Sequence, residues 1–204
     1  MILPLGRWAI REACRQAREW HEVCPDGPYP NVSVNLSAKQ VEHPDLIEEV
    51  AEALRETGLT PGALELEITE SVLMEDTAST IATLRRLKDL GVELSIDDFG
   101  TGYSSLSYLK RFPVDYLKID RSIVEGIERD PKNAAVVEAA ITLAHALGEK
   151  VIAEGVQTEE QLERLRQMGC DLAQGHHFSE PLPSEAALEV FREAARKEPD
   201  GYPT

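Results

Sequence analysis

The chain has 204 residues, of which 42% are hydrophobic and only 5% aromatic, and its formal net charge is −16. This length is enough for one domain with a single large core, and the composition favours an aliphatic core of the kind found in α/β proteins. The 21 basic residues are outnumbered by 37 acidic ones and form no segregated patch along the sequence. We therefore expect no binding to duplex DNA and no attachment to a membrane through a basic surface.

The three cysteines, Cys14, Cys24 and Cys170, are an odd number and show no CxxC spacing. They predict neither a disulfide framework nor a zinc site, and they indicate a reducing compartment. No segment approaches 18 consecutive apolar residues, and the N-terminus lacks the layout of a signal peptide. We expect a cytoplasmic protein with no membrane segment in this chain.

The first elements follow one another as helix, strand and helix. A helix is expected over residues 5–23, because apolar residues recur near 3.6-residue spacing at Trp8, Ala9, Ala13, Ala17 and Trp20. A strand is expected over residues 32–36, where Val and Leu alternate with polar residues. A second helix is expected over residues 45–57, with Gly58 as its stop signal.

The alternation of strand and helix then continues to the end of the chain. Further strands are expected at residues 64–69, 92–97, 115–120, 150–154 and 171–174. Further helices are expected at residues 77–90, 131–147, 159–168 and 184–197, with a short helix near 104–111 and Ser184 as the cap of the last one. We therefore expect one domain over residues 1–198 and a frayed tail over residues 199–204.

Regular β–α alternation implies parallel strands joined by right-handed crossovers, either in an open doubly wound sheet or in a (β/α)8 barrel. An open sheet normally carries a Gly-rich phosphate loop after its first strand, but Asn35-Leu36-Ser37 stands there instead. Polar residues also recur at the carboxyl ends of successive strands, as active-site residues of a barrel do. The prediction is a TIM-type (β/α)8 barrel truncated at its N-terminus to about six βα units.

The polar residues at these strand ends offer oxygen ligands. Asn35, Glu67, Asp97 and Asp98 are of the type that Mg²⁺ and Mn²⁺ prefer, and carboxylates gathered at one rim would repel one another without a cation. The alternative for each residue alone is a solvated polar group at a strand end. Asp115 and Asp120 flank Lys118, and one of them is expected to act as a cap or as an ion-pair partner rather than as a ligand.

Six ordered motifs, covering about residues 3–183, make the chain resemble the EAL family of cyclic di-GMP phosphodiesterases. They are Asn35-Leu36-Ser37, Glu67-Ile68-Thr69-Glu70, the run Asp97-Asp98-Phe99-Gly100-Thr101-Gly102-Tyr103-Ser104-Ser105-Leu106, Leu117-Lys118-Ile119-Asp120, Ala153-Glu154-Gly155-Val156, and Gln174-Gly175-His176-His177-Phe178-Ser179. The resemblance implies metal-dependent hydrolysis of cyclic di-GMP to linear pGpG, with one or two Mg²⁺ or Mn²⁺ ions.

The resemblance also implies roles for individual residues. It implies that Asn35, Glu67 and Asp97 are metal ligands, and that Asp98 holds a second metal or the attacking water. It implies that Lys118 orients that water or neutralises phosphate charge, and that Glu154 makes a further contact to metal or water. Gln174 would be a second-shell or substrate-side contact, and Glu70 would anchor the loop of residues 97–105. The resemblance also implies a homodimer that forms through this loop.

The sequence departs from the family pattern in three places. The namesake Glu-Ala-Leu strand is missing, because the triplet at residues 52–54 falls in an expected helix; a metal-binding Glu and a phosphate-contacting Arg are expected to be missing with it. Gln157 and His176 replace the usual Glu and Tyr. A metal role for the His176-His177 pair is not expected, because consecutive residues of a strand point to opposite faces.

Three functions remain open at this point. The first is the phosphodiesterase, as a fragment or truncated form. The second is a catalytically inactive EAL module that binds cyclic di-GMP or a protein partner. Self-association through unpaired strand edges is expected independently of this choice. The third is an unrelated metal-dependent barrel enzyme, which would leave the loop after Asp97-Asp98 unexplained.

Overall fold

The computed structural model describes residues 1–23, 31–73, 77–101 and 109–197. The expected short helix near 104–111 and the expected tail of residues 199–204 therefore lie mostly or wholly outside the described residues, as does most of the Gly-rich loop after Asp98.

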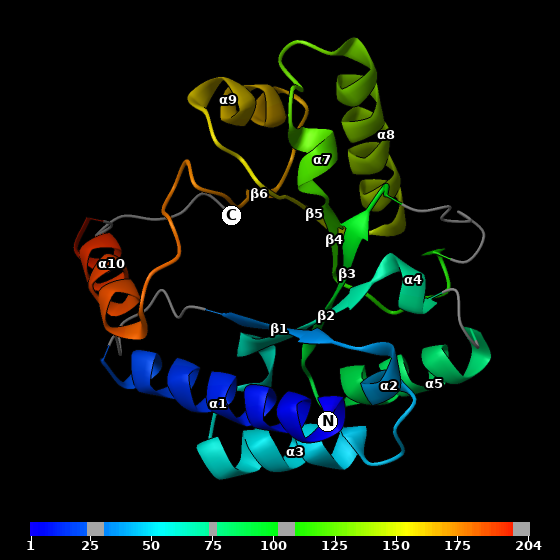
Figure 1. Ribbon diagram of the computed structural model, residues 1–204, viewed down its shortest axis with the longest axis vertical. Helices are drawn as coiled ribbons and strands as arrows, with labels where there is room; N and C mark the ends of the chain where they lie inside the picture. Colours follow the sequence, from blue (N-terminus) through cyan, green and yellow to red (C-terminus); the bar gives the residue numbers. More distant parts are fainter. Residues whose placement is uncertain (24–30, 74–76, 102–108, 198–204) are drawn as a thin grey trace.

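In the described residues, six parallel strands form one curved sheet and pair in chain order (Figure 1). They are β1 (Val32–Leu36), β2 (Leu64–Thr69), β3 (Glu93–Phe99), β4 (Tyr116–Ile119), β5 (Lys150–Ala153) and β6 (Leu172–Ala173). All six lie within two residues of the ranges expected from the sequence, and β6 is only two residues long. Parallel pairing of consecutive strands is the topology of a TIM-type barrel, and the described part of the chain contains six of its strands.

Helices cover the outer side of the curved sheet (Figure 1). The long ones are α1 (Ile2–Val23), α3 (Leu46–Thr57), α5 (Thr77–Asp89), α8 (Pro131–Leu147) and α9 (Glu159–Gln167). The last helix, α10 (Ser184–Lys197), instead lies beside the C-terminal end of α1 (Figure 1). Short turns, α2 (Ala38–Val41), η1 (Pro61–Ala63), α4 (Glu70–Leu73) and α7 (Arg121–Val124), lie at the ends of strands. Ser184 is the first residue of α10 rather than the cap before it.

The core lies between the sheet and these helices. Leu64, Leu66 and Ile68 of β2 are fully buried, and the neighbouring strands contribute alternate residues in the same way. Because strand side chains alternate between faces, the intervening residues line the concave side of the sheet. On β2, β3 and β4 these residues are polar or charged. The reactive side chains therefore lie on the concave side, whereas the apolar side chains that stabilise the fold lie on the convex side.

The buried stripe of α1 differs from the expected one. Gly6, Ile10, Cys14, Ala17 and His21 are its buried residues. Trp8, in contrast, is 61% exposed, and Trp20 packs edge-on against Phe191 of α10, with ring centroids 5.3 Å apart. The expected stripe is confirmed at Ala17, and Ala9 and Ala13 lie partly buried against the core, but the expectation was wrong for Trp8. Gly6 lies against the side chain of Gln40.

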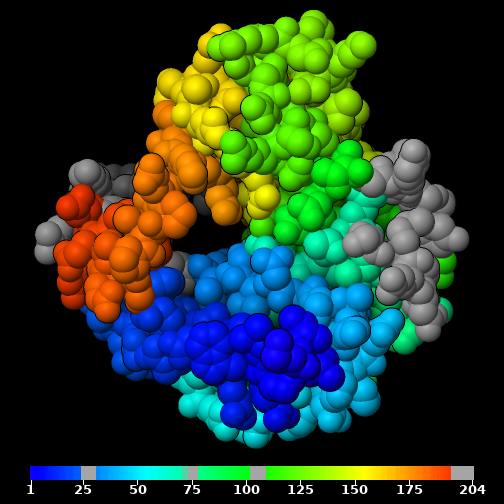
Figure 2. All heavy atoms as spheres, viewed as in Figure 1, coloured from blue at the N-terminus to red at the C-terminus, as the bar shows by residue number. Residues whose placement is uncertain are grey.

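The concave side of the sheet opens on a central hollow, which Figure 2 shows between the N-terminal part of the chain and the segment that joins β6 to α10. The edges of the sheet in the described residues are β1 and β6. None of the described helices is both long and apolar enough to cross a membrane.

Candidate functional site

The carboxyl ends of the strands bring the predicted polar residues to one rim. Asn35 of β1 lies directly opposite Glu67 of β2 in the strand register, and Asp97 of β3 lies opposite Thr69. Lys118 lies on β4, and Glu154 follows the last residue of β5. The rim predicted from the sequence is therefore present.

Lys118 is the centre of this rim. Its Nζ atom lies 2.5 Å from Glu67 Oε1, 2.7 Å from Glu154 Oε1 and 3.8 Å from Asp97 Oδ1. The lysine side chain is only 4% exposed, and the three carboxylates range from 8% to 21%. One buried cation thus faces carboxylates from three other segments of the sheet.

The electrostatics of the rim follow from this arrangement. Burial opposes the charge on Lys118, but its contacts with Glu154 and Glu67 outweigh burial and raise the pKa of the ammonium above its usual value. Burial raises the pKa of Glu154, and the nearby charges of Asp97 and Glu67 add to that effect, whereas Lys118 opposes it. Lys118 therefore stays charged, and it offsets part of the repulsion among the carboxylates.

Asp98 lies on a bulge at the end of β3. Ile96 of β3 pairs with Leu117 of β4, and the next pair is Phe99 with Ile119. Between these pairs β3 therefore contains one residue more than β4. Asp98 has a φ of 58°, a left-handed conformation that asparagine and aspartate tolerate better than most residues. Burial, followed by the charges of Asp97 and Asp120, raises the pKa of Asp98. Because of the bulge, Phe99 returns to the core and both aspartates stay at the rim.

Glu70 connects α4 to the loop after β3. Its side chain is 5% exposed, and Oε2 accepts a hydrogen bond from the backbone N–H of Gly100, with 3.2 Å between the two atoms. Gly100 has a φ of 96°, and a Cβ added there would lie 2.3 Å from Ile123 Cδ1. Within the described residues, the geometry is that of an anchor for the loop.

Gln174 lies beside Glu154, because the backbones of the segments after β5 and β6 remain hydrogen-bonded. Val156 N donates to Gln174 O at 3.0 Å, and Gln174 N donates to Ala153 O at 2.8 Å. Both side chains line a pocket of about 460 Å³, together with Arg121 and His176. Gly175 is needed here, because a Cβ on it would lie 2.2 Å from the Val156 carbonyl oxygen.

The remaining charged residues near Lys118 have structural contacts. Asp115 pairs with Lys88 at 2.6 Å and accepts from Leu94 N, and Asp120 caps α7 by accepting from Ser122 N. The prediction that one of them acts as a cap or an ion-pair partner is confirmed, and the structure shows such a contact for the other as well.

The two adjacent histidines lie in a turn rather than on a strand, so the expected alternation does not apply to them. His177 Nε2 lies 3.0 Å from Glu159, whereas His176 faces the pocket beside Gln174. They do not converge on a common ligand position. The Glu52-Ala53-Leu54 triplet lies in α3, where Glu52 pairs with Arg11 at 2.7 Å, so it does not belong to the rim.

Two residues near the rim were missed from the sequence. Glu65, 6% exposed, lies two residues before Glu67 on the same face of β2, and burial raises its pKa. Arg121 follows Lys118 by three residues and packs against Gly155, whose φ is 70°. The sequence signal for Arg121 was its place directly after the Leu117–Asp120 motif.

The rim fits a hard divalent cation by its chemistry. Asn35, Glu67, Asp97 and Asp98 supply amide and carboxylate oxygens from three adjacent strands, the donor type that Mg²⁺ and Mn²⁺ favour. Among the side chains that the structure describes, no three of the types His, Cys, Asp and Glu converge closely enough to hold an ion as they stand. The Lys118 ammonium takes the central position among the carboxylates, so an ion would have to share this space with it.

Comparison of the sequence with known proteins identifies one family. The family model of the EAL domain matches residues 1–181. The cyclic di-GMP phosphodiesterase NbdA of Pseudomonas aeruginosa is 47% identical over 196 residues, which cover 96% of this chain and 25% of NbdA. The chain spans about a quarter of the length of the curated relatives it matches.

Solved structures agree in fold. A structure of the PaMucR phosphodiesterase in complex with c-di-GMP is 44% identical, with a TM-score of 0.85 over 91% of this chain and 74% of that one. A manganese and cyclic di-GMP complex of BlrP1 from Klebsiella pneumoniae is 31% identical, with a TM-score of 0.79 over 89% of this chain and 45% of that one. Family model, sequence relatives and fold coincide over nearly the whole chain, which therefore belongs to the EAL domain family.

Proposed function

We propose that this chain hydrolyses one phosphodiester bond of cyclic di-GMP and releases linear pGpG. The observation that carries the proposal is the buried Lys118 ammonium, held among Glu67, Asp97 and Glu154 at the carboxyl rim of a parallel sheet. Active sites of barrel enzymes lie at this rim. NbdA is named as a cyclic di-GMP phosphodiesterase, and the PaMucR structure is a complex with c-di-GMP. Both support the choice of substrate.

The roles follow from position. Lys118 would orient the attacking water or neutralise charge that develops on the phosphoryl oxygens, since it is a fixed positive charge in a water-poor site. Glu154 holds Lys118 and reaches the pocket shared with Gln174, and this pocket would take part of the substrate. Arg121 at the same pocket would supply a guanidinium for a phosphate oxygen.

The proposed cofactor is Mg²⁺ or Mn²⁺, in one or two ions. Asn35, Glu67, Asp97 and Asp98 would hold it, and it would lower the pKa of a bound water. The manganese complex of BlrP1 supports this assignment. Glu70 would keep Asp97 and Asp98 in place through its hydrogen bond to Gly100.

Replacing Asp97 with Asn is expected to lower the rate of pGpG formation by more than about 100-fold, the upper end of the effect of residues that merely support metal ligands. The amide has the same shape but lacks the negative charge. The measurement is chromatography of cyclic di-GMP incubated with the purified chain and Mg²⁺ or Mn²⁺. Asp89→Asn, an exposed change at the end of α5, is the control and should keep full activity. Full activity in Asp97→Asn would show that the metal site is placed wrongly.

The alternative is an EAL module that binds cyclic di-GMP without hydrolysing it. It is favoured by the absence of a converged three-ligand group among the described residues. The same incubation separates the two proposals: binding of cyclic di-GMP without pGpG, with either metal, would exclude the hydrolase and support the module.

We further propose a homodimer. The outer face of α8 is apolar and exposed at Ala135, Val136, Ala139 and Ala146, and Val136 is 47% exposed. Replacing Val136 with Glu is expected to convert the dimer to a monomer, because a charge would be buried against the second copy. Light scattering of the wild type and the variant checks this, and a monomeric wild type would contradict it. The cytoplasmic location remains a prediction.

A further inference from the structure

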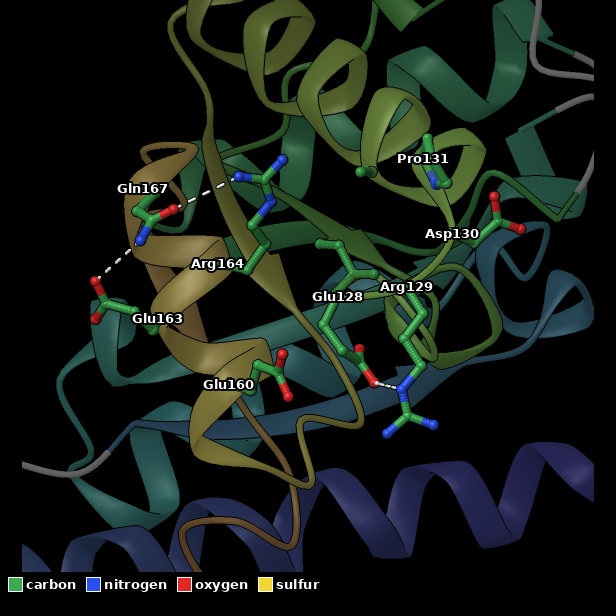
Figure 3. A pocket seen from close by; sticks show the side chains of 10 residues that line it. Glu128, Arg129, Asp130, Pro131, Glu160, Glu163, Arg164 and Gln167 are labelled. Atoms are coloured by element: carbon green, nitrogen blue, oxygen red, sulfur yellow. Dashed lines mark hydrogen bonds and ion pairs between the residues drawn. The ribbon is translucent and has the colours of Figure 1, made fainter.

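A second pocket lies away from the rim, between α9 and the turn that leads into α8. It has a volume of about 400 Å³ (Figure 3). Its floor is apolar, because Ile127 is 2% and Ala134 is 8% exposed, with Pro131 beside them. Charged side chains of Glu128, Glu160 and Arg164 stand around this floor. The pocket thus combines an aliphatic surface with charged walls.

Glu128 is the unusual member of this pocket. Its side chain is 9% exposed, and its Oε2 atom is buried without a hydrogen-bond partner among the residues that the structure describes. The other oxygen, Oε1, lies 3.3 Å from Nε of Arg129, whose side chain is 84% exposed. A buried carboxylate oxygen without a donor is costly, and such atoms in native proteins usually mark a missing donor from water, an ion or a ligand.

The groups around Glu128 in the described residues have other partners and do not supply this donor. Arg129 N and Asp130 N both donate to Gly126 O at 2.8 Å, and Asp130 is engaged as the cap of α8 through Lys132 N. Arg164 points to Gln167, with 3.5 Å between Nη1 and Oε1. Figure 3 shows Glu160 directed toward the same space as Glu128. Within the described part of the chain, Glu160 has no ion pair.

We infer that this pocket binds an alkylammonium or alkylguanidinium group, with its N–H donors between Glu128 and Glu160 and its methylene stem on Ile127, Pro131 and Ala134. Two carboxylates and an aliphatic floor suit such an amphipathic cation, since its charge is paired while its stem is buried. Arg129 is the group that turns outward when the cation enters. The group belongs either to a free amine or to a basic side chain of another protein.

The test is a titration of the ¹⁵N-labelled chain followed by the amide signals of residues 126–134 and 159–167. The probes are n-butylammonium, n-butylguanidinium and the peptide Gly-Gly-Arg-Gly-Gly. Saturable shifts confined to these residues are expected with either small cation. Tighter binding of the peptide would assign the site to a protein side chain, and its exclusion would assign the site to a free amine. n-Butyltrimethylammonium has the same charge but no N–H donor and is expected not to saturate.

The variants separate the pocket from the general attraction of an acidic protein. Glu128→Gln should weaken binding at least tenfold, whereas Glu125→Gln, an exposed charge three residues away, should leave it unchanged. Arg129→Ala should tighten binding, because it removes the internal competitor. Equal binding by Glu128→Gln and Glu125→Gln, saturation by n-butyltrimethylammonium, or weaker binding by Arg129→Ala would overturn the inference. The thermal unfolding of each variant confirms that it is folded, and pGpG formation plays no part in the readout.

Discussion

Replacing Lys118 with methionine is expected to lower the free energy of unfolding at pH 7 by about 3 to 5 kcal/mol, the usual cost of removing one partner of a buried ion pair. Methionine keeps the apolar stem of lysine up to Cε but lacks the ammonium, so it leaves Glu67, Asp97 and Glu154 facing one another without a cation. The measurement is urea denaturation followed by circular dichroism. Hydrolysis of cyclic di-GMP is expected to be lost in the same variant.

The matched control for this change is Lys132→Met, which removes the same charge from the exposed first turn of α8. Its free energy of unfolding should stay within about 0.5 kcal/mol of the wild type. The defect of Lys118→Met should also shrink when Mn²⁺ is added, because the three carboxylates then offer an open oxygen site. Equal stability of the two variants would show that Lys118 is not the charge that holds the rim together.

Replacing Glu149 with Gln changes the free energy of unfolding by an amount that depends on pH. This change is expected to be more favourable at pH 8 than at pH 5 by about 2 to 3 kcal/mol. Glu149 is 7% exposed, and its Oε2 atom is buried without a hydrogen-bond partner. Burial, aided by the charge of Asp115, raises the pKa of this carboxyl from 4.5 to about 7.

The sign follows from proton uptake. Between pH 4.5 and 7 the folded state holds the Glu149 proton and the unfolded state does not, so wild-type stability falls as pH rises through this window. Glutamine does not titrate, and the variant should lack this fall. The measurement is urea denaturation at pH 5, 6, 7 and 8, with Asp89→Asn at the exposed end of α5 as the control. Parallel pH profiles for wild type and Glu149→Gln would contradict the prediction.

Most of the elements were predictable from local patterns. Residues 131–147 form a helix with the predicted bounds, because Asp130 caps it, Pro131 begins it and Gly148, with a φ of 83°, ends it. β1 and β2 also have the predicted bounds, since strict alternation over five or six residues is a strong local signal. The end of β3 was predicted too early, because a bulge depends on the partner strand and leaves no local pattern.

Packing between segments far apart in the chain was less accessible. The motif at residues 117–120 marked Lys118 as a polar residue at a strand end, but only the register of β2, β3 and β5 around β4 brings three carboxylates to it. The predicted stripe of α1 included Trp8, which is exposed, and left out Gly6, Ile10 and Cys14, which are buried. Large side chains weigh most in a periodicity count, whereas close approach of a helix to its neighbours depends on small ones.

The sequence by itself determined the order of strands and helices, the parallel sheet and the family. It also identified Lys118 and the side chains with oxygen atoms at the carboxyl ends of the strands. These follow from hydrophobic periodicity and from motifs of a few residues, both of which are local. The tertiary structure alone decided that the Lys118 ammonium lies within 4 Å of Glu67, Asp97 and Glu154, that Asp98 lies on a bulge, and that Glu149 and Glu128 have buried oxygens without donors. Burial and charge pairing depend on which distant segments meet, and no local pattern encodes that.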